Sequence, residues 1–501
     1  MPPLANYIPA NKNPFALAAE LSGKLLIDSI LQPAQGGRTF ANINPATGAV
    51  IGQAAEGDAV DVDLAVKAAA RAQKDWGRMP ARERGKLLVE GARMLSHHTE
   101  ELARLVALET GKALRTESRV EASVLADVFN FYGGLGSELK GETVPFRPDM
   151  LTLTVREPLG VVGAIIPWNV PMMLMALKIA PALVAGNSVI VKSAEEAPFC
   201  VLRACQILNQ VLPPGVLNIL SGNGPDCGGP LVAHPDVRKV TFTGSVETGK
   251  IVYSTAALKL IPVTLELGGK SPMIVMQDAD LPKAVEGAVA GMRFTRQGQS
   301  CTAASRIFVH EALQDEFIER LVARIDGMKM GDPLDEATDI GTIISREQYE
   351  KVREYIRIGE SIPGARSFAC SSLPDNPALK DGLFVRPVIF SGVSNDTRLA
   401  REEIFGPVTC IIEFDSYDDA IDQANDSEYG LAATIWTQDL RTALQGAMQL
   451  EAGFVQVNQN LVVTSNLSYG GTKNSGLGKE ASLEAMLEHF THKKTIILNM
   501  Q

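Results

Sequence analysis

Short apolar runs alternate with segments of helical spacing through the middle of the chain, and this rhythm constrains the fold more than any other feature. Each run is too short to form a helix. Strands that alternate with helices are typical of a parallel sheet wrapped by crossover helices. Four such strands are predicted at 161–166, 188–192, 216–220 and 240–243.

A second series of the same kind follows Glu266, with helices predicted at 313–328 and 417–424. The chain has 501 residues and a mass of 53.7 kDa, which exceeds what one hydrophobic core usually supports, so two or three domains are expected. We therefore infer a second α/β domain. Its strands are predicted at 273–276, 307–310, 410–414 and 430–436.

The two ends of the chain differ from this middle part. Helical patterns at 60–75 and 81–110 carry no catalytic motif, and they predict a layer packed around another part of the fold. The segment 493–500 is a β-rich strand at the end of the chain, and an uncovered edge of this kind invites pairing. We expect pairing between subunits, and the alternative is a strand that closes its own sheet.

The segment 165–186 is long and apolar enough to suggest a membrane span. It contains three prolines, which break a helix, and Asn169 and Lys178, which would be stranded in lipid. We therefore predict a buried helix after a turn, and no membrane partner.

Composition argues against several other classes of protein. The net charge of -11 is spread along the chain without an acidic tail, so neither nucleic acid nor an anionic membrane is expected as a partner. The six cysteines form no Cys-x-x-Cys pair, and the first residues resemble neither an export nor a transit signal. We expect reduced thiols and a cytoplasmic protein. The histidines lack further ligands at zinc spacing, so no metal is assigned.

The strand predicted at 240–243 runs into a turn that contains Gly244, Ser245 and Gly249. Glycines at such a junction let backbone N–H groups and a helix N-terminus approach a phosphate. The turn nearly matches the P-loop of nucleotide hydrolases, but Ile251 stands where a hydroxyl would hold magnesium, and the GxGxxG spacing is absent. Two interpretations stay open, a phosphate contact and a tight strand-to-helix turn.

Lys192 and Glu195 stand at the end of another predicted strand, where α/β sheets place ligand contacts. A carboxylate there accepts hydrogen bonds from ribose hydroxyls and repels a 2′-phosphate, which favours NAD over NADP. The alternative is a solvated Lys and Glu at a strand end.

Asn169 follows a strand and precedes a helix, on a turn stiffened by Pro167 and Pro171. A fixed side-chain amide can donate to an oxygen that becomes negative, and one such donor is worth roughly 3 kcal/mol. A helix cap is the competing explanation.

Cys301 is flanked by small polar residues, unlike Cys410 in its apolar run, so we interpret it as a nucleophile and not as an inert buried thiol. Glu266 lies in a glycine-rich, otherwise apolar setting, where desolvation raises the pKa of a carboxyl toward that of a general base. The alternative for Glu266 is an ion pair with Lys270.

Taken together, these segments resemble the NAD(P)-dependent aldehyde dehydrogenase superfamily, in its hydrolytic, acid-forming branch. The resemblance covers nearly the whole chain, and its motifs occur in the family's order. They are Pro167-Trp168-Asn169, 192–195, 242–245, 266–270, 298–301 and 402–407.

The resemblance implies an α/β fold with two Rossmann-like open-sheet domains, one for the cofactor and one for catalysis, plus a small β oligomerisation flap. The NAD-binding domain would span 1–135 and 157–266, and the catalytic domain 267–468. The oligomerisation strands would lie in 136–156 and 485–501, since members are commonly homodimers or homotetramers.

The resemblance also implies a role for each matching residue. Cys301 would attack a small-molecule aldehyde, Asn169 would hold the oxyanion, and hydride transfer would leave a thioester. Glu266 would activate the water that hydrolyses this thioester, while Lys178 would support Asn169 and Glu266 from the next helix. The expected cofactor is NAD. Its contacts would come from Ile166, Pro167, Trp168, Lys192, Glu195, Gly244, Ser245, Gly249, Leu267, Glu403 and Phe405.

Some positions depart from the family pattern. The family often has Pro-Phe-Gly-Gly where this chain has Ser468-Tyr469-Gly470-Gly471, so the loop near the pocket is expected to differ. Leu177 and Thr295 stand near sites that are often aromatic, which suggests a wider substrate channel.

The substrate and the exact reaction stay open at this point. Arg293 and Arg296, near Cys301, keep a semialdehyde substrate possible. A CoA-acylating enzyme and a catalytically silent binding protein on the same scaffold are two competing hypotheses.

Overall fold

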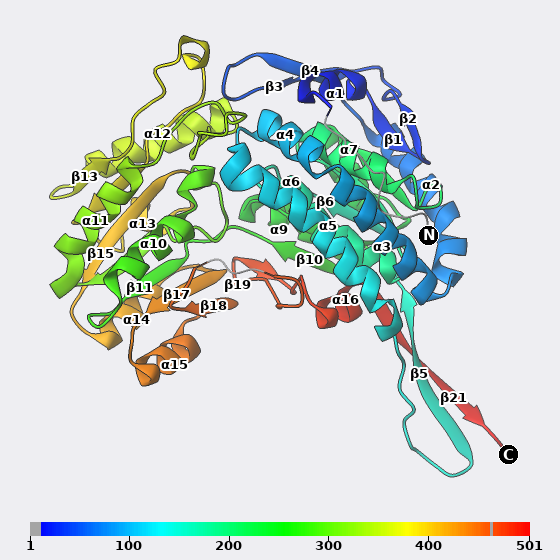
Figure 1. Ribbon diagram of the computed structural model, residues 1–501. Coiled ribbons are helices and arrows are strands. Elements are labelled where there is room, and N and C mark those ends of the chain that lie inside the picture. Colours follow the sequence, from blue (N-terminus) through cyan, green and yellow to red (C-terminus); the bar gives the residue numbers. More distant parts are fainter. Residues whose placement is uncertain (1–11, 461–463) are drawn as a thin grey trace.

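The computed structural model describes residues 12–460 and 464–501, which form two α/β lobes and a projecting two-stranded ribbon (Figure 1). The first lobe is built on an eight-stranded sheet. Its strands are β1 (Leu25–Ile27), β2 (Ile30–Gln32), β6 (Val161–Ile165), β7 (Ser188–Lys192), β8 (Leu217–Leu220), β9 (Val237–Thr243), β10 (Val263–Glu266) and β20 (Gly476–Leu477).

The strand order in this sheet is β2-β1-β8-β7-β6-β9-β10-β20. The five strands from β8 to β10 are parallel, and antiparallel strands extend both edges. The order changes direction at β6, because β7 and β8 lie on one side of it and β9 and β10 on the other. Such a reversal opens a crevice at the carboxyl ends of the strands, where α/β sheets bind ligands.

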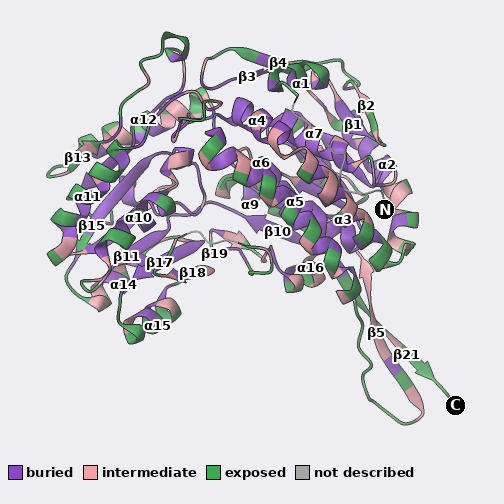
Figure 2. Ribbon diagram, viewed as in Figure 1, coloured by how far each residue is buried: buried purple, intermediate pink, exposed green. Residues whose placement is uncertain are grey.

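Helices cover both faces of the first sheet, so its central strands are buried throughout, as the purple strands in Figure 2 show. The helices of this part are α1 (Pro14–Leu21), α2 (Ala59–Arg78), α3 (Ala81–His97), α4 (Thr99–Thr110), α5 (Arg119–Gly134), α6 (Pro171–Val184), α7 (Pro198–Leu208), α8 (Gly229–Ala233), α9 (Val246–Ala257) and α16 (Leu483–His489). A π-helical turn, Leu114–Ser118, leads into α5.

In this lobe one prediction needs adjustment and another is confirmed. The helical stretch predicted at 81–110 is two helices, since His98 has a φ of -102° and a ψ of 9° and ends α3. The apolar segment at 165–186 holds α6, a buried helix after a turn, and Pro181 lies inside it. No helix in the described part of the chain is both long and apolar enough to cross a membrane.

The second lobe contains a seven-stranded sheet with the order β13-β14-β15-β12-β11-β17-β18, parallel except for β13. Its strands are β11 (Pro272–Val275), β12 (Arg306–His310), β13 (Arg366–Ala369), β14 (Val388–Ser391), β15 (Val408–Phe414), β17 (Ala432–Trp436) and β18 (Phe454–Val457). Its helices are α10 (Leu281–Met292), α11 (Gln314–Asp326), α12 (Arg346–Glu360), α13 (Arg398–Arg401), α14 (Tyr417–Asn425) and α15 (Leu440–Gln449).

The strand predicted at 430–436 is divided between two sheets. Its first residues belong to β16 (Tyr429–Gly430), which pairs with β19 (Thr472–Lys473) in a separate ribbon. The remainder is β17. Another small ribbon pairs β3 (Thr39–Ile43) with β4 (Val50–Ala55).

The predicted strand at the end of the chain is β21 (Thr491–Asn499), which pairs antiparallel with β5 (Met150–Pro158) over nine residues. This ribbon projects from the first lobe, and its residues are mostly exposed or half-buried (Figures 1 and 2). The strand therefore pairs within its own chain. Residues 142–144 cover part of the outer edge of β5, where the Val144 N–H donates to Thr152 O at 2.9 Å, while the outer edge of β21 has no strand partner in the described chain.

The predicted α/β class with two open parallel sheets and a small β flap is confirmed. The predicted domain ranges stay predictions. Strands of the first sheet come from 25–32, 161–266 and 476–477, and those of the second sheet come from 272–457. Residues 1–11 and 461–463 of the predicted ranges lie outside the described residues.

Candidate active site

Neighbouring parallel strands of the first sheet deliver the predicted residues to one edge. Asn169 follows β6, Gly244 follows β9, and Glu266 ends β10. Because the carboxyl ends of parallel strands meet at one edge, Asn169, Gly244 and the residue after Glu266, Leu267, line a shared cavity of about 230 Å³. Its lining residues are Pro167, Trp168, Asn169, Thr243, Gly244, Ser245, Leu267, Gly268, Cys301, Gln348, Lys351, Glu403 and Phe405.

Cys301 reaches this cavity on a loop that the second lobe supplies between α10 and β12. The loop turns through left-handed backbone at Gln297 and Gly298, and a Cβ at Gly298 would lie 2.1 Å from the carbonyl oxygen of Gly406. The Gln299 side chain ties the loop to the lobe, since it donates to Thr342 O and accepts from the Ile344 N–H. Cys301 is half-buried, whereas the other five cysteines are buried.

The Cys301 sulfur contacts the hydroxyl of Tyr469 at 3.5 Å. Burial raises the pKa of the Cys301 thiol to about 11, an effect that the Tyr469 hydrogen bond opposes. Glu403 and Glu266 raise this pKa further, and Arg296 lowers it. The sulfur is therefore a thiol at neutral pH, and it needs help to become an anion.

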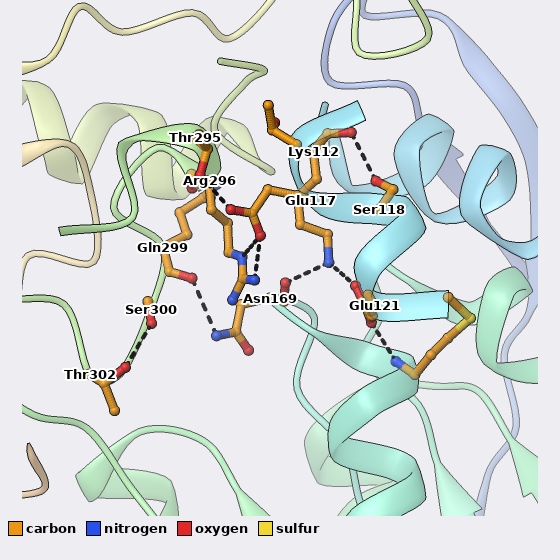
Figure 3. Close-up of polar contacts among 12 residues, drawn as sticks. Lys112, Glu117, Ser118, Glu121, Asn169, Thr295, Arg296, Gln299, Ser300 and Thr302 are labelled. Atoms are coloured by element: carbon orange, nitrogen blue, oxygen red, sulfur yellow. Dashed lines mark hydrogen bonds and ion pairs between the residues drawn. The ribbon is translucent and has the colours of Figure 1, made fainter. Parts of the chain in front are cut away.

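Asn169 is buried and turned toward the Cys301 loop. Its Nδ2 donates to the backbone carbonyl oxygen of Gln299 at 3.3 Å. The backbone carbonyl oxygen of Asn169 accepts from Lys112 Nζ at 2.8 Å (Figure 3). The alternative of a helix cap does not hold, because the N-cap of α6 is Val170 and no side chain caps it there. The amide is therefore available to a ligand.

A buried ion pair holds the backbone at Asn169 in place. Lys112 forms an ion pair with Glu121 of α5, and Glu121 also accepts from the Met172 N–H at 2.8 Å, in the first turn of α6 (Figure 3). Both side chains of the pair are almost completely buried. The pair fixes both sides of the turn that carries Asn169.

Glu266 is 3% exposed, and neither of its carboxyl oxygens has a hydrogen-bond partner in the described part of the structure. Burial raises its pKa well above the ordinary value, and the Glu480 carboxylate raises it further. No ion pair joins Glu266 to Lys270, whose Nζ likewise has no partner in the described chain. A buried carboxyl with a raised pKa and two unpaired oxygens suits a general base that takes a proton from a bound water molecule.

The support of Asn169 and Glu266 by Lys178 stays a prediction, and the hydrogen bonds of the Lys178 side chain go to other groups. Its buried Nζ donates to Glu480 at 2.6 Å and to the Thr241 hydroxyl at 3.3 Å. It therefore acts on Glu266 through its charge, which lowers the pKa of that carboxyl. The sequence prediction missed Glu480, because nothing in its local sequence pairs it with a lysine 302 residues away.

Glu403 and Phe405 meet the first lobe across the cavity. Glu403 Oε1 accepts from the Gly269 N–H at 2.9 Å, and a Cβ at Gly268 would lie 2.3 Å from Glu403 Oε2. The rings of Phe405 and Trp168 pack edge to face with centroids 5.2 Å apart. Glycine at 268 is thus required for the carboxyl to approach the backbone.

Four other predicted cofactor residues do not line this cavity. Lys192 and Glu195 pair with each other at 3.2 Å, and Glu195 borders a second cavity of about 420 Å³. Ile166 is buried behind the turn. A Cβ at Gly249 would lie 2.5 Å from Leu267 Cδ2, so this glycine lets α9 approach β10.

Three residues of the site were not predicted to act there. Gln348 donates to the carbonyl oxygens of Ile404 and Phe405, both at 2.9 Å, and so fixes the loop that carries Glu403. Lys351 lines the cavity one helical turn further along α12. Tyr469 was noted only as a departure from a pattern, and only the structure places its hydroxyl on Cys301.

Comparison with known proteins gives consistent results. A sequence profile of the aldehyde dehydrogenase family matches residues 31–496. Hydroxyisobutyraldehyde dehydrogenase of Mycolicibacterium austroafricanum is 41% identical over 470 residues, which cover 94% of this chain and 92% of that protein. Betaine aldehyde dehydrogenase of Rhizobium johnstonii is 41% identical over 466 residues, covering 93% and 94%.

Among solved structures, the NAD+ complex of an aldehyde dehydrogenase from Bacillus cereus superposes with a TM-score of 0.94 at 37% identity. The match covers 98% of this chain and 99% of that one.

Proposed function

This chain belongs to the aldehyde dehydrogenase family and is an NAD-dependent oxidoreductase of that family, and we propose that Cys301 is the nucleophile that takes up the aldehyde. The observation that carries this proposal is the Tyr469-Gly470 segment. Tyr469 contacts the Cys301 sulfur, and a Cβ at Gly470 would lie 2.6 Å from Glu266 Oε1. One dipeptide therefore brings together a thiol and a buried carboxyl, a nucleophile and a base for successive steps.

In the first step, the Cys301 sulfur bonds to the carbonyl carbon, and negative charge develops on the carbonyl oxygen. The Asn169 amide has two N–H bonds, of which Gln299 accepts one. The other remains for the substrate oxygen, and the Cys301 backbone N–H, which has no acceptor within the described chain, is the second donor. Each such donor is worth roughly 10²-fold to 10³-fold in rate.

The lining of the cavity fits a dinucleotide. The Thr243 hydroxyl is buried at the lining without a partner in the described residues, and Glu403 Oε2 is not engaged by the Gly269 N–H. The Gly244 N–H donates to the backbone carbonyl oxygen of Glu266 at 3.1 Å, so the donor left at the start of α9 is the Ser245 N–H, which has no acceptor within the described chain. The chemistry that NAD supplies when bound is acceptance of a hydride from the thiohemiacetal carbon, which leaves a thioester on Cys301.

In the last step, Glu266 takes a proton from the water that attacks the thioester. The bond between the acyl carbon and the sulfur breaks, the acid leaves, and Cys301 is left as a thiolate that keeps the electron pair of that bond. Glu266 keeps this proton until it returns it to solvent water, and the charges of the buried Glu480 and Lys178 act on its pKa in opposite directions.

We further propose that Glu195 disfavours NADP, since its partly exposed carboxylate would face a 2′-phosphate. The domain ranges 1–135 with 157–266 and 267–468, a cytoplasmic location and a homodimer or homotetramer formed through the ribbon belong to the same proposal. The six free cysteines support a reducing compartment. The relatives' names, hydroxyisobutyraldehyde and betaine aldehyde dehydrogenase, support a small aldehyde as the substrate.

Two measurements test this mechanism. Products are analysed with and without coenzyme A: we expect free acid in both cases, and acyl-CoA would favour the CoA-acylating alternative. In Glu266→Gln, we expect the first burst of NADH to persist while steady turnover falls by at least about 10²-fold. Loss of the burst as well would show that Glu266 acts before hydride transfer.

A further inference from the structure

The hydroxyl of Tyr469 is a feature of the site that the mechanism above does not use. It lies 3.5 Å from Cys301 Sγ, and neither atom has another hydrogen-bond partner in the described part of the chain. Tyr469 stands where the family pattern often has phenylalanine, a residue that fills the same space without a polar atom.

The hydroxyl is set up to donate. Burial raises the pKa of Tyr469 well above its ordinary value, and the neighbouring Cys301 and Glu266 raise it further, so the phenol keeps its proton. With no other acceptor in reach, the O–H bond is left to the sulfur. Hydrogen bonds to an ionised acceptor are about twice as strong as neutral ones, so this contact favours the thiolate over the thiol.

The side chain is held in place before any substrate arrives. Its backbone forms an antiparallel bridge with Glu480, with N–H···O distances of 3.0 and 2.7 Å. Its ring packs against Phe454 with centroids 5.7 Å apart. Because both the backbone and the ring of Tyr469 are held in place, the hydroxyl needs no rearrangement to contact the sulfur.

We propose that Tyr469 is a catalytic residue of this enzyme, whose phenol O–H stabilises the Cys301 thiolate. The proposal rests on Cys301 being the nucleophile. The sulfur is an anion just before it attacks the aldehyde and again when the acid leaves, and the hydroxyl stabilises it at both points. No proton passes from Tyr469 to the sulfur: the thiol proton passes to a water molecule in the cavity and from there to solvent, and the phenol keeps its own.

The test is the pH profile of Cys301 alkylation by iodoacetamide in the full-length enzyme, with the labelled cysteine identified by mass spectrometry. In Tyr469→Phe, we expect the midpoint to rise by about one pH unit and the rate at pH 7.5 to fall about tenfold. This variant keeps all the charged groups that act on the sulfur, so only the phenol hydroxyl changes. These groups are Glu403, Glu266, Arg293 and Arg296. The kcat/KM for the aldehyde should fall by a similar factor.

Tyr132→Phe is the matched control, since Tyr132 is also buried and its hydroxyl donates to the carbonyl oxygen of Ser482 at 3.4 Å. We expect its alkylation profile to match that of the wild type. A profile of Tyr469→Phe that superposes on the control would overturn the proposal. Undiminished acid formation by Cys301→Ala would instead overturn the mechanism on which it rests.

A second variant tests the proposal even if Tyr469→Phe does not fold. A difluorotyrosine incorporated at position 469 keeps the ring and makes the hydroxyl a stronger donor. We expect the alkylation midpoint of Cys301 to fall below that of the wild type. An unchanged or raised midpoint would contradict a donating role.

Discussion

At the scale of single residues, position 470 shows how little space separates the base from the backbone. A Cβ at Gly470 would lie 2.6 Å from Glu266 Oε1 and 2.9 Å from the carbonyl oxygen of Gly478. The φ of this residue is +144°, a region that side chains rarely adopt. Glycine is therefore needed here for both the backbone and the active site.

We predict that Gly470→Ala lowers kcat at least about tenfold and costs about 1–3 kcal/mol of stability, through backbone strain and displacement of the Glu266 carboxyl. Thermal unfolding and steady-state assays measure the two effects. Gly134→Ala is the control, because a Cβ at Gly134 meets nothing within 4 Å and that variant should behave as the wild type. Equal kcat values for the two variants would contradict the prediction.

The raised pKa of Glu266 predicts a pH dependence. Only the ionised carboxylate can take a proton from water, so deacylation should rise as pH increases through the Glu266 pKa. Since the Glu480 carboxylate helps to raise this pKa, Glu480→Gln should move the rising limb of kcat to lower pH. The limb should be absent in Glu266→Gln. A shift of the limb to higher pH in Glu480→Gln would show that Glu480 does not act through its negative charge.

At the scale of elements, a buried ion pair connects α5 to the turn before α6. Lys112 and Glu121 form a nearly completely buried pair that also binds the Asn169 carbonyl and the Met172 N–H (Figure 3). Burying such a pair is costly, and removing one member leaves an unpaired charge in the interior. The arrangement gives the Asn169 amide a fixed position.

We predict that Lys112→Met destabilises the fold by about 3–5 kcal/mol and reduces aldehyde oxidation, because Glu121 loses its cation and Asn169 its support. The control is Lys86→Met, which breaks an exposed pair with Glu83 and should cost less than about 1 kcal/mol. Urea denaturation of both variants measures the difference. Similar costs for the two substitutions would mean that the buried pair has no structural role.

At the scale of the whole molecule, the projecting ribbon of β5 and β21 needs further packing contacts to be stable. A two-stranded ribbon is marginal on its own, and this one exposes Leu151, Ile497 and Leu498. Exposed apolar residues on the outer edge of β21 support the proposal that this ribbon contacts another subunit.

We predict that Ile497→Asp, which places a charge on this surface, lowers the oligomeric state measured by light scattering. Leu373→Asp, at an exposed loop position away from the ribbon, should leave the assembly of the wild type intact. An unchanged mass for Ile497→Asp would argue against an interface at the ribbon.

The sequence by itself determined the alternation of strands and helices that builds the two sheets, because apolar periodicity and turn residues are local properties. Several strands were not predicted, among them β1–β4, β10, β13, β14 and β18. The sequence also identified Cys301, Asn169 and Glu266 as candidates, since each stands in a short segment whose neighbours suit its proposed chemistry. Even so, it could not separate one helix from two at 81–110, where periodicity continues across His98.

Only the tertiary structure decided which groups meet. It joined Lys178 to Glu480, excluded an ion pair between Glu266 and Lys270, and turned Asn169 toward the Cys301 loop instead of the helix end. It also placed the Tyr469 hydroxyl on the sulfur, 168 residues along the chain. These contacts depend on how two sheets and their loops pack in space, and no local pattern encodes a distance between segments so far apart.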